Sequence, residues 1–226
     1  EALWPSQYPR ERLDKIKSGM NDLEEWNALF QQKPRPAETG EVSSDWFTKY
    51  DKLPADEPYL RVVSWDTAGT NNERSDYTVG LAVAIGLKTR NFYLLDMYRK
   101  RATFPDLLKD VPAFNRKWEA KAVLIENKGT GTSLIQVLRN TGGSNIIAIA
   151  PQKQGSKEFR FEQAVPTLEA GRVFRPAKAE WWAQFIEELL TFPEGVHDDI
   201  VDAFSQVINH YSTRGRRRGT QPLAGA

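Results

Sequence analysis

The sequence of 226 residues contains no cysteine and only 2 histidines. Without cysteine the chain has no disulfide framework, no thiolate metal site and no cysteine nucleophile. So few histidines also argue against a zinc site built on histidine. No apolar run approaches the roughly 20 residues that a membrane span requires, so no membrane contact is expected. Any chemistry must therefore rest on carboxylates, hydroxyls and amines.

Neither sign of charge prevails, because 31 Lys and Arg stand against 30 Asp and Glu, a formal net charge of +1. A surface for nucleic acid therefore has to come from local segregation of charge. Hydrophobic residues make up 40% and charged residues 27% of the chain, which excludes wholesale disorder and a fibrous repeat. The length suits one core of ordinary size with a small appendage.

Composition divides the chain into three parts. Residues 1–58 are polar and rich in proline, with one amphipathic helix expected over Asn21–Gln32, and we interpret them as an arm or linker that packs on the rest of the chain. Residues 59–212 alternate strands and helices and form the predicted α/β domain. Residues 213–226 make a basic tail around the run Arg214–Arg218, which is predicted to be flexible.

The predicted α/β domain begins with three apolar runs and continues with helices and short buried runs in alternation. The predicted strands are Leu60–Trp65, Tyr77–Ile85, Phe92–Tyr98, Ala122–Ile125, Ile146–Ala150 and a short edge strand, Val173–Phe174. The predicted helices are Phe104–Glu119, Thr130–Asn140, Phe159–Glu169, Ala179–Thr191 and Asp198–Tyr211. A meander followed by strand–helix alternation predicts a mixed sheet with helices on both faces.

Acidic residues stand where an α/β sheet collects its ligands, at the carboxyl ends of strands. Asp66 follows the first predicted strand and Glu126 follows the fourth. A third acidic group, which consists of Asp198, Asp199 and Asp202, opens the last predicted helix. Carboxylates are the ligands of hard cations such as Mg²⁺. Two such ions about 3.5–4 Å apart can drive in-line phosphoryl displacement without a histidine base, so the set predicts a metal site.

Each of these acids also has a structural explanation. Asp66 can cap the turn that comes after it, Glu126 can pair with Lys128 at the surface, and an aspartate at a helix start can cap the helix. Asp202 is harder to explain as a cap because it lies one turn inside its helix, beside both preceding aspartates. Such crowding of like charge is destabilising unless cations offset it. The set is more informative than any one member.

Four short motifs carry a resemblance to a known family. They are Val63–Ala68, Ser75–Thr78, Leu124–Asn127 and His197–Ala203. Together they resemble the C-terminal nuclease domain of the terminase large subunit of tailed bacteriophages, over about residues 26–211. Residues 26–36 with Gly40 resemble the segment that joins the ATPase to the nuclease. The resemblance implies a ribonuclease H-like α/β fold, with a mixed central β-sheet flanked by helices on both faces.

The resemblance implies a divalent-metal-dependent endonuclease that cuts concatemeric viral double-stranded DNA during genome packaging, with two Mg²⁺ or Mn²⁺ ions. Carried onto this sequence, the catalytic residues are Asp66, Glu126 and Asp199, with Asp198 and Asp202 as further metal ligands. Asp199 is placed ahead of Asp198 because the segment it opens resembles the paired aspartates of Holliday-junction resolvases. Helical periodicity alone does not separate the two.

The resemblance also implies partners and further site residues. The expected partners are double-stranded DNA, the terminase ATPase domain, the small terminase subunit and the portal, in the host cytoplasm and transiently at the procapsid. Because packaging acts on many sequences, DNA is expected to be held through its phosphates. Two residues are expected to support the metal site, Asp76 and His197. The residues expected to contact DNA are Lys128, Lys153, Lys157 and Arg160.

One departure from the family is large. Terminase large subunits begin with an ATPase motor, yet this sequence has no G-x-x-x-x-G-K-S/T phosphate loop. The Gly-rich segment Gly129–Ser133 lacks the lysine in register, and we interpret it as a strand-to-helix turn. No motor activity is therefore expected from this chain.

Three other interpretations stay open. A Holliday-junction resolvase or transposase-like nuclease would use the same metals, although the joining segment counts against it. A non-catalytic module that docks DNA for a packaging motor would bind DNA without cutting it. An actin-like or sugar-kinase-like ATPase would require glycine phosphate motifs that the sequence lacks.

Overall fold

A computed structural model describes residues 9, 11–13, 15, 42–67, 77–143, 145–150 and 154–212. The strands in these residues are β1 (Thr48–Tyr50), β2 (Tyr59–Asp66), β3 (Thr78–Gly86), β4 (Phe92–Lys100), β5 (Ala122–Glu126), β6 (Ile146–Ile149) and β7 (Val173–Pro176). The helices are the short 3-10 helix η1 (Ser44–Trp46) and α3 (Phe104–Lys117), α4 (Thr130–Asn140), α5 (Lys157–Glu169), α6 (Trp182–Thr191) and α7 (Asp199–Ser212).

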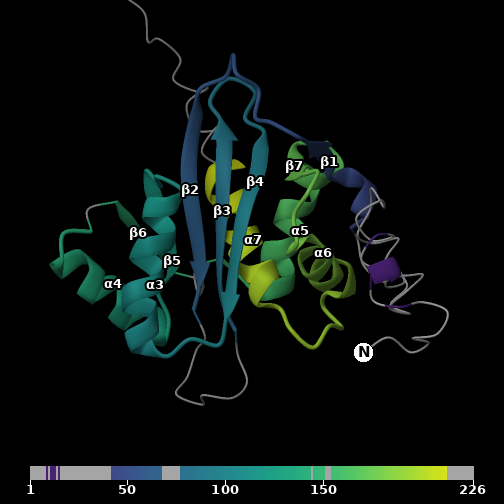
Figure 1. Cartoon of the computed structure of the whole chain (residues 1–226). Coiled ribbons are helices and arrows are strands. Elements are labelled where there is room, and N and C mark those ends of the chain that lie inside the picture. The colour runs from purple at the N-terminus through teal and green to yellow at the C-terminus, as the bar shows by residue number, and fades with distance from the viewer. Residues whose placement is uncertain are drawn as a thin grey trace, which may run out of the picture.

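The described strands form one sheet in the order β1-β7-β4-β3-β2-β5-β6, and Figure 1 shows the long strands β2, β3 and β4 at its centre. These three pair antiparallel as a meander. β5 pairs parallel to β2, β6 to β5 and β7 to β4. β3 is buried along its whole length, as expected of a central strand that has helices above and below it.

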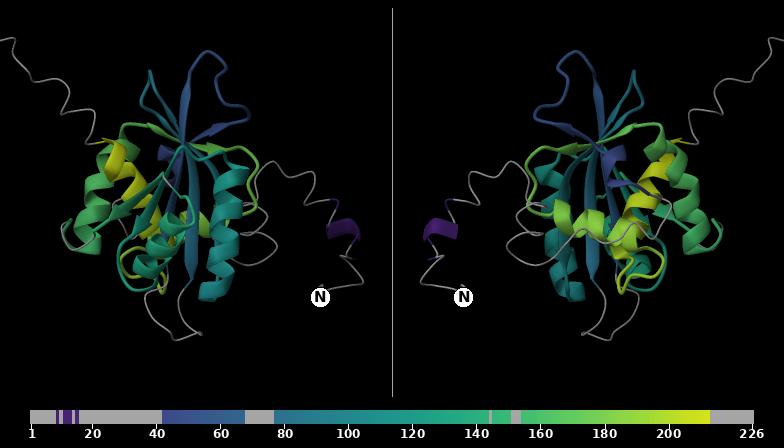
Figure 2. Two further views of the ribbon diagram at one scale, coloured as in Figure 1. Left: turned by 90° about the vertical axis from the view of Figure 1, so that its left-hand side faces the viewer. Right: turned by 90° about the vertical axis from the view of Figure 1, so that its right-hand side faces the viewer.

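Helices cover both faces of the sheet, as both views in Figure 2 show. α3 and α4 pack on one face, over an apolar cluster that includes Trp65, Leu107 and Leu134. α5, α6 and α7 pack on the other face, over a cluster that includes Phe185 and Phe204. The mixed sheet with helices on both faces, which the order of elements predicts, is confirmed.

The edge of the sheet differs from the prediction, because β7 is not an edge strand. β1 pairs parallel to β7 and takes the edge itself. Just before β1, Phe47 is buried, with its ring 5.2 Å from that of Trp182 on α6. A strand of three residues is too short to show alternation, so the pattern missed it. The sheet thus takes in residues upstream of position 59, and the division into arm and domain stays a prediction.

Three predicted features lie outside the described residues. They are the helix over 21–32, the joining segment 26–36 and the basic tail 213–226. Within the part of the chain that the structure describes, no helix has the length and apolar character needed to cross a lipid bilayer.

Trp65 anchors the end of β2 from the α3 face. Its side chain is fully buried, and its indole N–H donates to Asn115 Oδ1 of α3 at 3.0 Å. Gly80 stands opposite it on β3, where a Cβ would lie 2.6 Å from the indole ring. Glycine therefore makes room for the ring, and the packed ring holds the next residue, Asp66, at a defined position.

Candidate metal centre

Asp66 and Glu126 end two neighbouring parallel strands. β2 and β5 pair in a register that places Trp65 opposite Ile125, so the acids that come next in each strand stand side by side at the edge of the sheet. Successive side chains of a strand point to opposite faces, and Trp65 and Ile125 belong to the cluster under α3 and α4. Both acids therefore face α7, and Glu126 is close enough to raise the pKa of the Asp66 carboxyl.

Helix α7 brings the acids of the last motif to the same end of the sheet. Gln206 donates to Ser64 Oγ at 2.9 Å and to the Trp65 carbonyl at 3.3 Å, which fixes α7 to the end of β2. The helical pattern predicts a polar face for Asp202, but α5 packs on α7 and leaves this side chain only 7% exposed. Asp202 is thus a buried acid beside the strand ends.

Several acidic side chains lie close together where β2, β5 and α7 meet. Burial raises the pKa of the Asp66 carboxyl well above its usual range, and the hydrogen bond with Glu126 and the nearby Asp202 and Asp199 carboxylates raise it further. Acids from β2, β5 and α7 are therefore close enough to disfavour one another's charge. A divalent cation among them would reverse that penalty.

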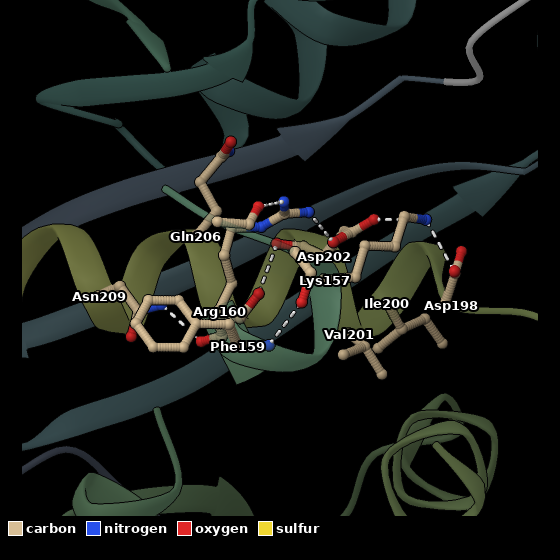
Figure 3. Close-up of polar contacts among 12 residues, drawn as sticks. Lys157, Phe159, Arg160, Asp198, Ile200, Val201, Asp202, Gln206 and Asn209 are labelled. Atoms are coloured by element: carbon tan, nitrogen blue, oxygen red, sulfur yellow. Dashed lines mark hydrogen bonds and ion pairs between the residues drawn. The ribbon is translucent and has the colours of Figure 1, made fainter. Parts of the chain in front are cut away.

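Two cations of α5 engage the acids of α7, as Figure 3 shows. Lys157 Nζ lies 2.7 Å from Asp198 Oδ2 and 2.8 Å from Asp202 Oδ2. Arg160 Nη2 lies 2.6 Å from Asp202 Oδ1, so both carboxylate oxygens of Asp202 are engaged. These ion pairs offset the crowding of like charge on α7. Among the described residues, no group of three or more acidic or histidine side chains is arranged to hold an ion.

The residues predicted to contact DNA differ in their surroundings. Lys128 is exposed, two residues after the acid at the end of β5. Lys157 and Arg160 bind the acids of α7, and the Arg160 side chain is 10% exposed. Lys153 lies outside the described residues. A DNA contact by any of these four residues stays a prediction.

The residues predicted to support the site are described in part. His197 is half-buried and directs its ring edge-on to Tyr77, with 5.2 Å between the ring centroids. Tyr77 in turn carries the guanidinium of Arg99 over its ring at 3.7 Å. The described contact of His197 is therefore a packing contact, as a structural histidine would make. Asp76 lies outside the described residues.

Glu188 is a buried acid near the site that sequence reasoning missed. Its Oε1 accepts hydrogen bonds from the backbone N–H groups of Ile200 at 2.5 Å and Val201 at 3.3 Å, in the first turn of α7. Its Oε2 lies 3.6 Å from Arg99 Nη2. The sequence does carry a signal, because Glu188 lies three residues after Phe185 and therefore shares the apolar face of its helix.

The Gly-rich segment after β5 is the strand-to-helix turn that the sequence predicts. Gly131, in the first turn of α4, lies against the strand ends. A Cβ there would come within 2.1 Å of the Glu126 carbonyl oxygen and 2.9 Å of Thr67 Oγ1. The backbone of α4 therefore approaches the site as closely as only glycine allows.

Replacing Gly131 by alanine is expected to destabilise the fold by about 1–3 kcal/mol, because the added methyl forces α4 away from the strand ends. Urea unfolding measures the change. Ser133→Ala, at an exposed position of the same helix, is the matched control. Equal stability of the two variants would show that α4 tolerates displacement and does not support the site.

The comparison with known proteins identifies relatives of this sequence and of its fold. The sequence matches the family described as the terminase RNaseH-like domain over residues 63–211, which is more than half of the chain. No curated protein sequence matches the chain. The large terminase nuclease from thermophilic phage G20c, solved with bound zinc, is similar in structure, with a TM-score of 0.54 and 18% identity over 74% of this chain and 95% of that one.

Two further structures share the fold. The nuclease domain of the Thermus phage P74-26 large terminase has a TM-score of 0.51 and 18% identity over 71% of this chain and 89% of that one. A large terminase from another thermophilic bacteriophage, solved in complex with ADP, has a TM-score of 0.56 and 14% identity, and the match covers 88% of this chain but 51% of that protein. The predicted resemblance and the ribonuclease H-like fold are confirmed. The chain therefore belongs to the family of terminase RNaseH-like domains.

Proposed function

We propose that the chain is a divalent-metal-dependent endonuclease that cuts concatemeric viral double-stranded DNA during genome packaging. What supports the proposal most is that Glu126 at a strand end and Asp199 and Asp202 at a helix start all help to raise the pKa of the buried Asp66 carboxyl. The G20c nuclease, which shares the fold, has been solved with zinc, magnesium and cobalt. These relatives support the inference that the acids serve to bind ions.

The residues at this end of the sheet fit Mg²⁺ or Mn²⁺. Their donors are carboxylate oxygens, which both ions prefer, and the pKa of Asp66 rises because burial and neighbouring acids disfavour its charge. The adjacent hydroxyl of Thr67 is buried and has no hydrogen-bond partner among the described residues. We assign Asp66, Glu126 and Asp199 as the principal ligands, as the family resemblance implies, and both oxygens of Asp202 lie against cations of α5.

In this proposal the acids at the strand ends bind the cation, and a nearby lysine contacts DNA. Burial and the neighbouring acids raise the pKa of Asp66, so a cation that binds there has to compete with a proton for this carboxyl. Exposed Lys128, beside the end of β5, is suited to contact a DNA phosphate. Bound at the acids, the ions supply an activated water and stabilise the leaving oxygen of the cut strand.

The partners of the proposed enzyme are inferred from the same family. The chain spans about half the length of the large terminase that was solved with ADP. We propose that this nuclease acts beside a terminase ATPase domain, with the small terminase subunit and the portal as further partners. DNA is held through phosphate contacts, which suit a packaging enzyme because they do not depend on sequence.

Supercoiled plasmid is expected to be nicked and linearised when Mn²⁺ or Mg²⁺ is added and to stay intact with EDTA.

Binding of the ion is also expected to stabilise the fold. An ion at about a hundred times its Kd stabilises the fold by about 2.7 kcal/mol, which corresponds to a rise in Tm of about 5–10 °C. Calorimetry with Mn²⁺, with EDTA and with ATP alone measures that shift. A Tm that rises with ATP but not with Mn²⁺, and plasmid that stays intact, would contradict the nuclease proposal.

A further inference from the structure

A buried ion pair connects the centre of the sheet to the start of α7. Arg99 on β4 and Glu188 on α6 have side chains that are 9% and 6% exposed, with 3.6 Å between Nη2 and Oε2. The guanidinium of Arg99 also lies over the ring of Tyr77 at 3.7 Å. Both charged groups are therefore buried, and Arg99 is also held by the ring of Tyr77. The ion pair thus has a defined geometry.

Glu188 provides the cap of α7, although it belongs to another helix. The first N–H groups of a helix have no partner within it, and a residue at the helix start usually accepts from them. Here the carboxylate of Glu188 accepts from Ile200 and Val201, while Asp198 accepts from Lys157. The position of the start of α7 therefore depends on α6, and Asp198 bonds a cation instead of capping its own helix.

Placing Glu188 here carries an electrostatic cost. Burial raises the pKa of Glu188 to about 7, and the nearby Asp199 raises it as well, whereas the Ile200 N–H and Arg99 lower it. A neutral cap from Asn or Ser would serve the helix without adding charge beside the acids. Glu188 differs from such a cap in one respect, because its second oxygen reaches Arg99 and so connects α7 to β4.

We propose that Glu188, held by Arg99, is a positioning residue of the metal centre, which sets Asp199 against Asp66 and Glu126 by capping α7 from outside. This inference rests on the proposed function. It predicts that ion binding requires an oxygen at position 188 that accepts from the start of α7.

Mn²⁺ affinity, measured by calorimetric titration of the full chain, tests the proposal. Glu188→Ala is expected to weaken Mn²⁺ binding about tenfold or more, the range typical of outer-sphere partners of a metal site. Glu188→Gln keeps an oxygen that can accept from α7, so it is expected to retain most of the affinity. Glu187→Gln, at the exposed neighbouring position, is the matched control and is expected to bind as the wild type does.

Urea unfolding of the same variants separates positioning from stability. If Glu188→Ala does not fold, the double variant Arg99→Met with Glu188→Met removes both charges at similar volume and is expected to fold while still binding Mn²⁺ weakly. The inference would be overturned if the folded Glu188→Ala or double variant bound Mn²⁺ as tightly as the wild type. It would also be overturned if Glu188→Ala and Glu188→Gln lost equal Mn²⁺ affinity. Neither result would contradict the proposed function. A wild-type chain that binds no Mn²⁺ would overturn the proposed function together with it.

Discussion

Replacing Asp66 by asparagine is expected to abolish DNA cleavage and to leave DNA binding intact. Asp66 is the acid that the others surround, and an amide cannot supply the charge that an ion at this site requires. Losing a ligand that stabilises the transition state by about 4 kcal/mol lowers the rate by about a thousandfold. Nicking of plasmid with Mn²⁺ measures the rate, and fluorescence anisotropy with labelled duplex measures DNA binding.

Asp56→Asn is the matched control, because Asp56 is exposed and precedes the other end of β2. This variant is expected to cut DNA at the wild-type rate. If the Asp66 and Asp56 variants cut equally well, the catalytic assignment fails. If neither they nor the wild type cut while all bind DNA, the chain is a docking module rather than a nuclease.

The same Asp66 variant is expected to be more stable than the wild type in EDTA at neutral pH. The pKa of Asp66 is raised by folding, so the folded chain holds that proton more tightly than the unfolded chain does. Wild-type stability therefore falls as pH rises from the ordinary aspartate range through the raised pKa. Asparagine does not titrate, so the variant lacks this fall. Urea unfolding at about pH 5 and about pH 8 compares the two proteins.

Arg160→Met is expected to destabilise the fold by about 3 kcal/mol, because it leaves Asp202 buried with only one cation beside it. Lys157→Met is expected to cost less, about 1 kcal/mol, since the Lys157 side chain is 39% exposed and water screens such a pair. Urea unfolding in EDTA measures both changes. The comparison asks whether Arg160 primarily stabilises the buried acid of α7.

The double variant Arg160→Met with Asp202→Leu is expected to recover most of the lost stability, because an apolar pair can replace a buried ion pair. If it also binds Mn²⁺ as tightly as the wild type, Asp202 is not a metal ligand. Equal stability of the Arg160 and Lys157 single variants would contradict the expectation that Arg160 is the main partner of buried Asp202.

The positions of the two strand-end acids were readable from the sequence because local pattern determines them. An apolar run that ends at an acid predicts a strand with a carboxylate at its edge, and β2 and β5 end at Asp66 and Glu126 in that way. The helical period likewise predicts α7 and its acidic start. By contrast, β1 is too short for any period to appear, and its place beside β7 depends on pairing with a distant segment.

The sequence by itself determined the kind of site: oxygen donors from three segments, without thiolate and with little imidazole, at the end of a mixed sheet. Only the tertiary structure decided which cationic side chains form ion pairs with these acids and which residue caps the start of α7. Lys157 and Arg160 bind the acids from 41 and 42 residues away, and Glu188 caps a helix that is not its own. Such contacts depend on how helices pack over one another, and helix packing is set by many distant side chains together, which no local pattern records.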